Sequence, residues 1–312
     1  MTLHKRIAAL ALAGAVAVPG AAIAQETIGY ITKSATNAGW QMINQGAEDA
    51  AAEAGADLVA VGPSFQGDLS GQLEVFDNLV SQGVDAIGVA PVDSSGVAPA
   101  VEDAMASGIP VVAIDTGVSG ADVASFVATD NAAVAQVQGA VAATLVENGD
   151  KIIYVTGNLA QSTGQDRKDG FMSSFTAARP DSEILEVPTE WNSQEAQEGV
   201  EALLNSNPGV AMIVNAWDGG TMGAKAALEN LGYGPGDVKL VGFDGASDAV
   251  QAMEDGWVHA DTAQMLYQIG YQGVQAAIRA ARDEPVEDRI DTGFFLVTPA
   301  TMGVYKDMVG IE

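Results

Sequence analysis

Short runs of β-branched and apolar residues alternate with longer alanine-rich segments along most of this chain. The first run covers residues 27–32, and the segment from 39 to 54 after it has the apolar spacing of a helix. Strands that alternate with helices of about 10–15 residues are typical of βαβ units and a parallel sheet. The alternation continues with strands expected at 57–61, 86–90, 111–114 and 124–128 and helices expected at 72–81, 97–106 and 131–146.

The alternation begins again at residue 151, which predicts a second unit of the same kind. Its strands are expected at 151–156, 184–187, 210–214 and 238–243, and its helices at 166–178, 193–204, 221–231 and 246–254. The tail adds strand-like stretches at 260–264 and 290–297 and a long helical stretch at 265–281. Glycines suited to a left-handed C-cap follow several helices: Gly55, Gly83, Gly108, Gly149, Gly232 and Gly256. The predicted fold class is therefore α/β, with two doubly wound domains.

The first 24 residues have the organisation of a secretory signal peptide. Lys5 and Arg6 precede an apolar stretch at 7–18, and residues 22–24 have the small-residue pattern of a cleavage site. The apolar stretch is too short to span a membrane, and the alternative is an apolar N-terminal helix of the fold. We therefore expect residues 1–24 to be removed on export, with cleavage near Ala24. The chain contains no Cys, so disulfides do not stabilise the exported protein.

Acidic residues dominate the charge of the chain. Its 41 Asp and Glu against 13 Lys and Arg give a formal net charge of −28 at pH 7. Such a field repels nucleic acid and anionic membrane surfaces, so nucleic acid is not expected as a partner. The acidity either serves solubility in salty surroundings or reflects the acidic composition common among exported soluble proteins.

Residues that carry catalytic or metal chemistry are scarce. His259 is the single histidine beyond the N-terminal segment, and no Ser-His-Asp order, zinc-protease motif or Cys/His cluster is present. The glycines at 219–223 lack the lysine of a phosphate-binding loop and suit the start of a helix. The sequence therefore predicts no enzyme activity, no metal and no cofactor. A glycoside-acting enzyme with Asp115 and Asp244 as its carboxylate pair is a distant alternative.

Two of the predicted strands, one in each unit, end in an aspartate. Asp115 ends the run at 109–115, and Asp244 ends the run at 238–244, directly before Gly245. Ligands of open parallel α/β sheets bind at the carboxyl ends of the strands. The pair therefore predicts a ligand held between two domains by opposed acceptors. The alternatives are a turn aspartate at Asp115 and an N-cap aspartate at Asp244.

Several short motifs follow one another in a characteristic order and spacing. They are Gln45-Gly46-Ala47, Gly83-Val84-Asp85-Ala86-Ile87, Gly108-Ile109-Pro110-Val111, Thr129-Asp130-Asn131, Arg167-Lys168-Asp169-Gly170-Phe171, Val241-Gly242-Phe243-Asp244-Gly245 and Gln264. Through these motifs the chain resembles the periplasmic sugar-binding proteins of ABC importers, in the ribose-binding-like branch of the type I periplasmic binding protein family. The resemblance covers nearly all of residues 26–298.

The resemblance implies two Rossmann-like lobes joined by three crossover segments, with the ligand in the cleft between them. Lobe 1 would comprise residues 26–129 and 265–292, and lobe 2 would comprise 130–264 and 293–312. It also implies a periplasmic protein that closes on its ligand and delivers it to an ABC permease in the inner membrane. A chemoreceptor is left open as a further partner. The sensor domain of a repressor has the same fold, but it would need a DNA-binding segment where the signal peptide lies.

The resemblance also implies which residues bind the ligand. Residues that match the family pattern are Asn37, Trp40, Asp115, Thr129, Arg167, Trp191, Phe243, Asp244 and Gln264. Carboxylates and the arginine would bond hydroxyl groups, and the tryptophans would cover the apolar C–H faces of the ligand. An Asx-turn is the alternative for Asn37, a surface charge for Arg167, and core packing for the two tryptophans.

Three further candidates depart from the ribose-type pattern. Lys33 takes the place of a small polar residue, Thr116 that of an arginine, and Trp217 that of an asparagine. These changes argue against ribose itself, although a small polyhydroxylated ligand, a sugar or a polyol, is still expected. Lys33 together with Arg167 would also suit a sugar acid. Lys33 followed by residues 61–63 and 70–72 is similar to the branch that binds the furanosyl signal autoinducer-2, which is the other alternative.

Overall fold

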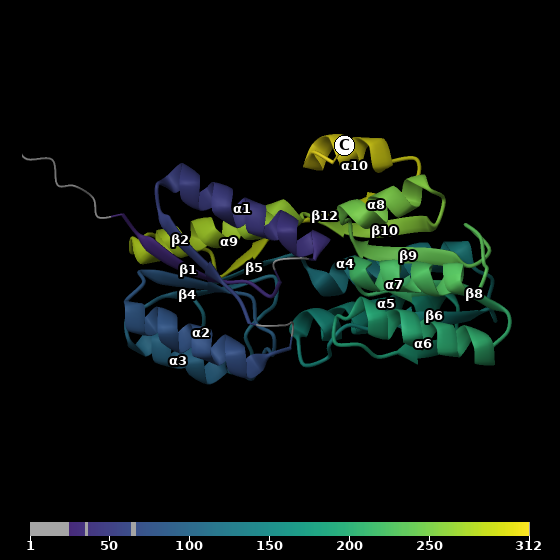
Figure 1. Cartoon of the computed structure of the whole chain (residues 1–312), viewed down its shortest axis with the longest axis horizontal. Coiled ribbons are helices and arrows are strands. Elements are labelled where there is room, and N and C mark those ends of the chain that lie inside the picture. Colours follow the sequence, from purple (N-terminus) through teal and green to yellow (C-terminus); the bar gives the residue numbers. More distant parts are fainter. Residues whose placement is uncertain (1–24, 35–36, 64–66, 312) are drawn as a thin grey trace, which may run out of the picture.

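The computed structural model of this protein describes residues 25–34, 37–63 and 67–311. These residues form two α/β units that lie side by side along the long axis of the molecule (Figure 1). The predicted signal peptide, residues 1–24, lies outside the described residues. Within the part of the chain that is described, no helix combines the length and the apolar character needed to cross a membrane.

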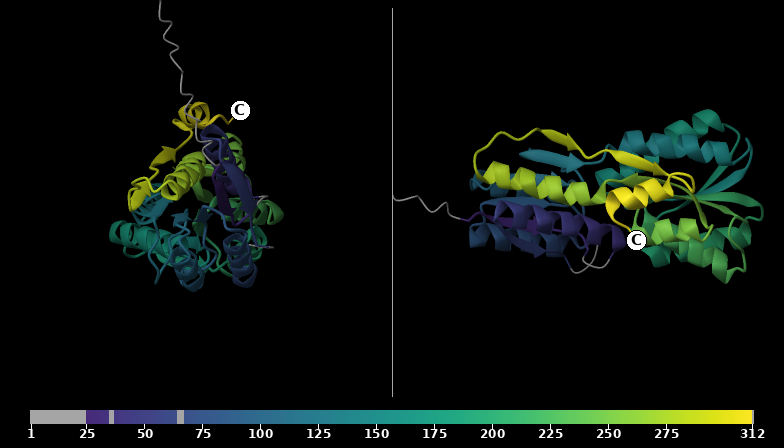
Figure 2. Two further views of the ribbon diagram at one scale, coloured as in Figure 1. Left: turned by 90° about the vertical axis from the view of Figure 1, so that its left-hand side faces the viewer. Right: turned by 90° about the horizontal axis from the view of Figure 1, so that it is seen from above.

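The first unit, called lobe 1, is built on a parallel sheet with the strand order β11-β5-β4-β3-β1-β2. Its strands are β1 (Thr27–Ile31), β2 (Asp57–Val61), β3 (Ala86–Val89), β4 (Val111–Ile114), β5 (Ser125–Ala128) and β11 (Arg289–Asp291). Its helices are α1 (Ala38–Ala54), α2 (Leu69–Gln82), α3 (Ala98–Ala106) and α9 (Leu266–Ala281). Helices α1 and α9 lie side by side on one face of the sheet (Figure 2), and α2 and α3 cover the other face. An apolar cluster fills each of the two interfaces.

The second unit, called lobe 2, repeats this topology with the strand order β12-β10-β9-β8-β6-β7. Its strands are β6 (Lys151–Val155), β7 (Glu183–Val187), β8 (Val210–Asn215), β9 (Lys239–Asp244), β10 (Val258–Gln264) and β12 (Phe294–Val297). Its helices are α4 (Asn131–Leu145), α5 (Ser162–Ala178), α6 (Ser193–Ser206), α7 (Asp218–Asn230), α8 (Ser247–Glu254) and α10 (Met302–Val309). Only β12 runs antiparallel to its neighbour among the described pairs of this sheet. The predicted α/β class with two doubly wound units is therefore present.

The chain passes between the two lobes at three places. Residues 129–130 join β5 to α4, Met265 joins β10 to α9, and residues 292–293 join β11 to β12. The first and third passages lie together, because the Thr129 hydroxyl is 3.3 Å from that of Thr292 and 3.4 Å from the carbonyl oxygen of Gly293. We propose the lobe boundaries that were expected from the sequence, since each falls at one of these passages.

The structure differs from the predicted elements in three ways. Helices α2, α5 and α7 begin three or four residues before the predicted starts at 72, 166 and 221, because their first turns are polar and lack apolar periodicity. The single strand expected at 290–297 is wrong, since Gly293 adopts a φ of 76° and the chain changes sheets there. Helix α10 was not predicted. The six glycines after helices all have positive φ, as expected, and Gly55 and Gly83 are themselves C-caps.

Candidate functional site

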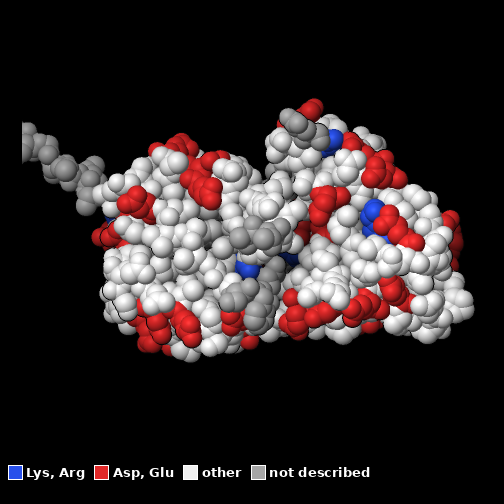
Figure 3. All heavy atoms as spheres, in the orientation of Figure 1, with Lys and Arg blue, Asp and Glu red and all other residues white. Residues whose placement is uncertain are grey.

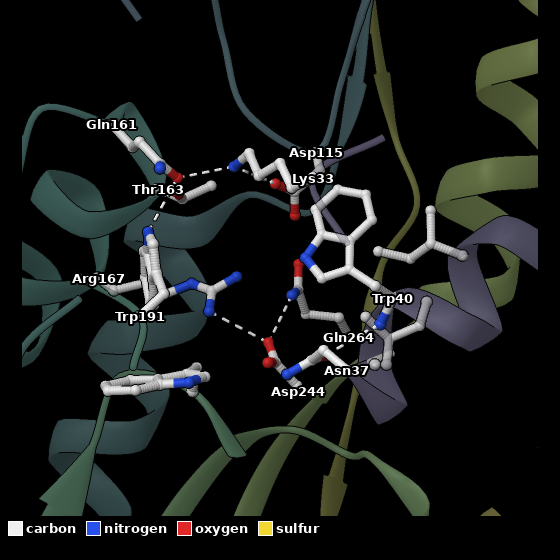
Figure 4. Close-up of a pocket in the computed structure, with 14 residues that line it drawn as sticks. Lys33, Asn37, Trp40, Asp115, Gln161, Thr163, Arg167, Trp191, Asp244 and Gln264 are labelled. Atoms are coloured by element: carbon white, nitrogen blue, oxygen red, sulfur yellow. Dashed lines mark hydrogen bonds and ion pairs between the residues drawn. The ribbon is translucent and has the colours of Figure 1, made fainter. Parts of the chain in front are cut away.

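A cleft lies between the two lobes, where the carboxyl ends of both sheets meet. Figure 3 shows cationic side chains in the hollow between the lobes, whereas most of the charged side chains elsewhere on this face are acidic. The cleft is lined by Lys33, Asn37, Gly39, Trp40, Ile43, Asp115, Gln161, Thr163, Arg167, Trp191, Trp217, Asp244, Gln264 and Leu266 (Figure 4).

On the lobe 1 side, Lys33 and Asp115 form a buried ion pair. Lys33 follows β1 and Asp115 follows β4, so both stand at the carboxyl edge of the sheet. The Lys33 ammonium donates to Asp115 Oδ2 at 3.1 Å, to Thr116 Oγ1 at 2.6 Å and, across the cleft, to Gln161 Oε1 at 2.7 Å. Burial lowers the pKa of Lys33, and the Asp115 carboxylate opposes that shift. Three acceptors thus use all three protons of this ammonium group.

On the lobe 2 side, Arg167 of α5 and Asp244 at the end of β9 form a second buried ion pair. The guanidinium donates to Asp244 Oδ1 at 3.1 Å, to Asn131 Oδ1 at 2.8 Å and to the Ala216 carbonyl oxygen at 2.7 Å. It also lies 4.1 Å from the ring centroid of Phe243, a favourable cation–π distance. Burial raises the pKa of Asp244, and the charge of Arg167 opposes that shift. The arginine is therefore held by lobe 2 before any ligand binds.

Three tryptophans supply the flat apolar walls of the cleft. Trp40 lies in the first turn of α1, and its ring centroid is 5.7 Å from the Lys33 ammonium. The rings of Trp191 and Trp217 meet edge to face, with centroids 5.3 Å apart. A Cβ on Gly157 would lie 2.0 Å from the Trp191 ring, and a Cβ on Gly220 would lie 2.7 Å from the Trp217 ring. Both rings are thus packed directly against glycine backbone.

We predict that Gly157→Ala displaces the Trp191 ring and weakens ligand binding about 10-fold, which corresponds to about 1.4 kcal/mol. The added methyl group cannot fit beside the ring without movement. Titration calorimetry of the variant measures the loss. Gly303→Ala in α10 is the matched control, because a Cβ there meets nothing within 4 Å. Equal affinities in Gly157→Ala and the unmodified protein would contradict a ligand contact by Trp191.

The backbone is strained at three residues that line the cleft. Asp115, Trp191 and Asp244 have φ values of 65°, 59° and 124°, and Asp283 is the one other non-glycine residue with positive φ in the described chain. Such conformations cost about 1–3 kcal/mol each and persist only where surrounding contacts enforce them. The fold therefore holds these three side chains in fixed directions toward the cleft.

Direct hydrogen bonds tie the two lobes together beside the cleft. Gln161 of lobe 2 accepts from Lys33 and from the Trp191 indole, at 2.9 Å, and donates to the Val92 carbonyl oxygen at 3.0 Å. Further bonds join lobe 1 residues to the neighbouring 160–163 segment. We call residues 160–163 the clasp. The clasp makes this a closed arrangement of the lobes, in which Gln161 has both ends of its amide bonded to protein.

Hydrogen-bonding atoms at the cleft residues are left over for a ligand. Among the described residues, no hydrogen bond to Asp115 Oδ1 is present, and Gln264 Oε1 is buried without a partner. The amide nitrogen of Asn37 and the buried Trp217 Nε1 are donors without a described partner. A hydroxyl group both donates and accepts, so this mixture of acceptors and donors complements a compound rich in hydroxyls.

The structure brings most of the predicted site residues together. Nine of them line the cleft: Lys33, Asn37, Trp40, Asp115, Arg167, Trp191, Trp217, Asp244 and Gln264. Thr116, Thr129 and Phe243 do not: Thr116 lies behind Lys33, Thr129 lies in the first passage between the lobes, and Phe243 lies beneath Arg167. Sequence reasoning missed Gln161 and Thr163 of the clasp. Their one signal is a polar segment directly after β6, at the carboxyl edge of the sheet.

The structure also shows which of the alternative roles considered for these residues apply. Asn37 caps α1 through a bond from the Trp40 amide to its Oδ1 at 3.1 Å, and it lines the cleft as well. Asp244 does not cap α8, whose N-cap residue is Ala246. Arg167 is buried rather than a surface charge. The glycines at 219–223 lie in the first turns of α7, as predicted.

Comparison with known proteins places the fold and the cleft in context. Residues 28–285 match the model of the periplasmic binding protein domain family. The ribose import binding protein of Salmonella typhimurium is 29% identical over 295 residues, which cover 94% of this chain and 98% of that protein. An ABC transporter solute binding protein from Mycobacterium smegmatis with bound glycerol is 30% identical, with a TM-score of 0.83 over 90% of this chain and 96% of its own. A carbohydrate transporter solute binding protein from Agrobacterium radiobacter, in complex with D-arabinose, is 26% identical, with a TM-score of 0.85 over 93% and 100%.

These matches decide between the classes considered from the sequence. The family model covers most of the chain, and both solved structures share the two-lobe fold. The glycoside-acting enzyme is therefore wrong, because the family and the neighbours are solute-binding proteins. The chain belongs to the periplasmic binding protein family, among the ribose-binding-like solute-binding proteins of ABC transporters, as its motifs predict.

Proposed function

We propose that this protein is the substrate-binding component of an ABC importer and that it closes its lobes around one small, uncharged polyhydroxylated compound. The observation that carries the proposal is the balance of charge in the cleft. Lys33 is paired with Asp115, and Arg167 is paired with Asp244, each at 3.1 Å. The two pairs together are neutral, so the described residues of the cleft offer no spare cation to neutralise an anionic ligand.

The charge balance favours a sugar or polyol over a sugar acid. A carboxylate brought into this cleft would lose its hydration without gaining an unpaired cation, and burying such a charge costs several kcal/mol. A neutral polyol loses only hydroxyl hydration, and Asp115, Asp244 and Gln264 offer acceptors that replace it. Bonds to the two carboxylates are charge-assisted and are therefore the stronger ones.

The proposed setting follows from the family and from the N-terminal sequence. We propose that the protein works in the periplasm, after cleavage near Ala24, and presents its closed form to a permease in the inner membrane. The acidity of the chain, whose full sequence has 41 acidic against 13 basic residues, keeps the protein soluble there. A chemoreceptor that binds the same closed form is a further proposed partner, and pull-down of membrane proteins with ligand-saturated protein would test it.

A thermal-shift screen tests the proposed function. Residues 25–312 are mixed separately with D-ribose, D-allose, xylitol, myo-inositol, a furanosyl autoinducer-2 preparation and the aldonic acids of the two sugars. Because a ligand that binds only the folded protein stabilises it by mass action, a true ligand raises the unfolding temperature with its concentration. We expect a neutral sugar or polyol to give the largest shift. A larger shift with an aldonic acid or with the furanosyl signal would replace the proposed ligand class.

A further inference from the structure

A second group of buried carboxyls lies directly behind the ligand-facing Asp244. Asp218 is the first residue of α7 and Asp261 lies in β10, and each is 1% exposed. Neither residue lines the cleft. Buried carboxyl groups without a cation are rare because an isolated buried charge is costly. Their position therefore calls for a function other than ligand contact.

The two carboxyl groups hold the backbone of the segment that carries Asp244. Asp261 Oδ1 accepts from the Gly245 amide at 3.1 Å, and Asp218 Oδ2 accepts from the Ala246 amide at 2.7 Å. The Tyr305 hydroxyl donates to the Gly245 carbonyl oxygen at 2.8 Å. Asp244 and Gly245 both have positive φ, at 124° and 73°. These three bonds, from three different elements, fix the strained turn that directs Asp244 into the cleft.

The other oxygens of the two carboxyl groups lie close together, and Asp218 Oδ1 also accepts from the Thr221 hydroxyl at 3.4 Å. Asp261 Oδ2 and Asp218 Oδ1 lie 2.3 and 2.7 Å from the same point, the position a Cβ would take on Gly242, so they are at most 5.0 Å apart. Among the described residues, Asp261 Oδ2 is buried and has no hydrogen-bond partner. Two ionised carboxylates this close together and this deeply buried would repel each other, so we infer that one of the pair carries a proton.

The surroundings favour retention of the proton. The titratable groups that face the pair are Asp244 of β9, Asp248 of α8 and Tyr305 of α10, and Arg167 of α5 is directed at Asp244 rather than at the pair. No cation bonds Asp218 or Asp261 among the described residues. Burial raises the pKa of Asp261 to about 7 and raises the pKa of Asp218 well above its ordinary value, and the charge of Asp244 adds to both shifts.

We propose that Asp218 and Asp261 form a proton-sharing pair that positions Asp244, and that loss of the shared proton at rising pH loosens the 244–246 turn and releases the ligand. A second negative charge at this buried position has no cation to pair with. It would repel its partner and Asp244 and break the bonds to Gly245 and Ala246. The ligand-release part of this inference rests on the proposed function, whereas the shared proton does not.

Asp218→Asn tests the inference, because an asparagine amide can donate to Asp261 and accept from the Ala246 amide as the protonated acid does. Asp248→Asn is the matched control, since it removes a partly buried carboxylate that faces the pair, while no hydrogen bond joins Asp248 to Asp218 or Asp261 among the described residues. The experiment has two arms, and the first, infrared spectroscopy at pH 7 to 8, needs no ligand. We expect a protonated carboxyl band in the unmodified protein and in Asp248→Asn that is absent from Asp218→Asn. The same band in all three proteins would overturn the shared proton.

The ligand arm measures affinity between pH 6 and pH 10 for the strongest neutral binder among D-ribose, D-allose, xylitol and myo-inositol. We expect the affinity of the unmodified protein and of Asp248→Asn to fall as the pH rises over this range. The affinity of Asp218→Asn should fall less, by a factor of at least about 10, which is the equivalent of one pKa unit. Deprotonation of Lys33 would affect all three proteins alike. Parallel pH profiles, or weak binding by Asp218→Asn at every pH, would overturn the positioning role. If none of the four compounds binds, the proposed function fails, and the infrared arm still decides on the proton.

Discussion

Asp244→Asn is expected to weaken ligand binding by at least about 100-fold while the ligand-free protein stays folded. Hydrogen bonds to a charged group contribute about 1.5–3 kcal/mol each, and the Asp244 carboxylate, which lines the cleft, would form one or two of them with ligand hydroxyls. The asparagine has the same shape and can still accept from Arg167 and Gln264 through its oxygen. Titration calorimetry measures the affinity, and thermal unfolding without ligand checks the fold.

Asp248→Asn serves as the control for this variant. Asp248 lies four residues further along the chain and does not line the cleft, so its replacement should leave the affinity within about 2-fold, well below 1.4 kcal/mol. An Asp244→Asn protein that binds as tightly as the unmodified protein would show that the ligand does not contact this carboxylate.

Arg167→Met is expected to lower the free energy of unfolding by about 3–5 kcal/mol, the usual effect of removing one partner of a buried ion pair. Without the guanidinium, Asp244 keeps a buried charge, and Asn131 Oδ1 and the Ala216 carbonyl oxygen lose their donor. Methionine fills most of the same space beside Phe243. Urea unfolding of the ligand-free protein measures the change, and ligand binding should be lost together with the position of Asp244.

The loss of stability in Arg167→Met should also depend on pH. With its cation removed, Asp244 has a pKa raised further by burial. A group whose pKa is higher in the folded state stabilises the fold at low pH, and that contribution disappears as pH rises through the folded-state pKa. The deficit should therefore be smaller at pH 5 than at pH 8.

Lys168→Met provides a matched control at the next position of α5. Lys168 pairs with Glu186 at the surface, and both side chains are substantially exposed. Exposed ion pairs contribute about 0–1 kcal/mol, so this variant should unfold almost like the unmodified protein. Equal losses in Arg167→Met and Lys168→Met would contradict a structural role for the Arg167–Asp244 pair.

Most of the fold could be predicted because its signals are local. Most strands of the two sheets are short apolar runs, and most helices have their own apolar periodicity, so element type and order follow from residues close in sequence. The failures occur where distant contacts decide. Gly293 ends one strand and begins another because the chain changes sheets there, and α10 packs on β12 without a strong pattern of its own.

Only those residues of the candidate site that follow directly from the sheet topology could be predicted from the sequence. Asp115 and Asp244 were found because both follow strands, and the carboxyl ends of parallel strands meet at one edge. The clasp could not be found in the same way, since Gln161 bonds Lys33 and Val92 only when the lobes meet. The pairing of Asp218 with Asp261 likewise depends on two elements that are far apart in the sequence.

The central claim is that the cleft holds a neutral polyhydroxylated ligand between two internally neutralised ion pairs. Calorimetric titration with the strongest neutral sugar or polyol and with the aldonic acid of the same carbon skeleton tests it most directly. We predict that the neutral compound binds with one site per chain and that the acid binds at least about 100-fold more weakly, a difference of about 2.7 kcal/mol. Equal or tighter binding of the acid, at the same site, would contradict the account.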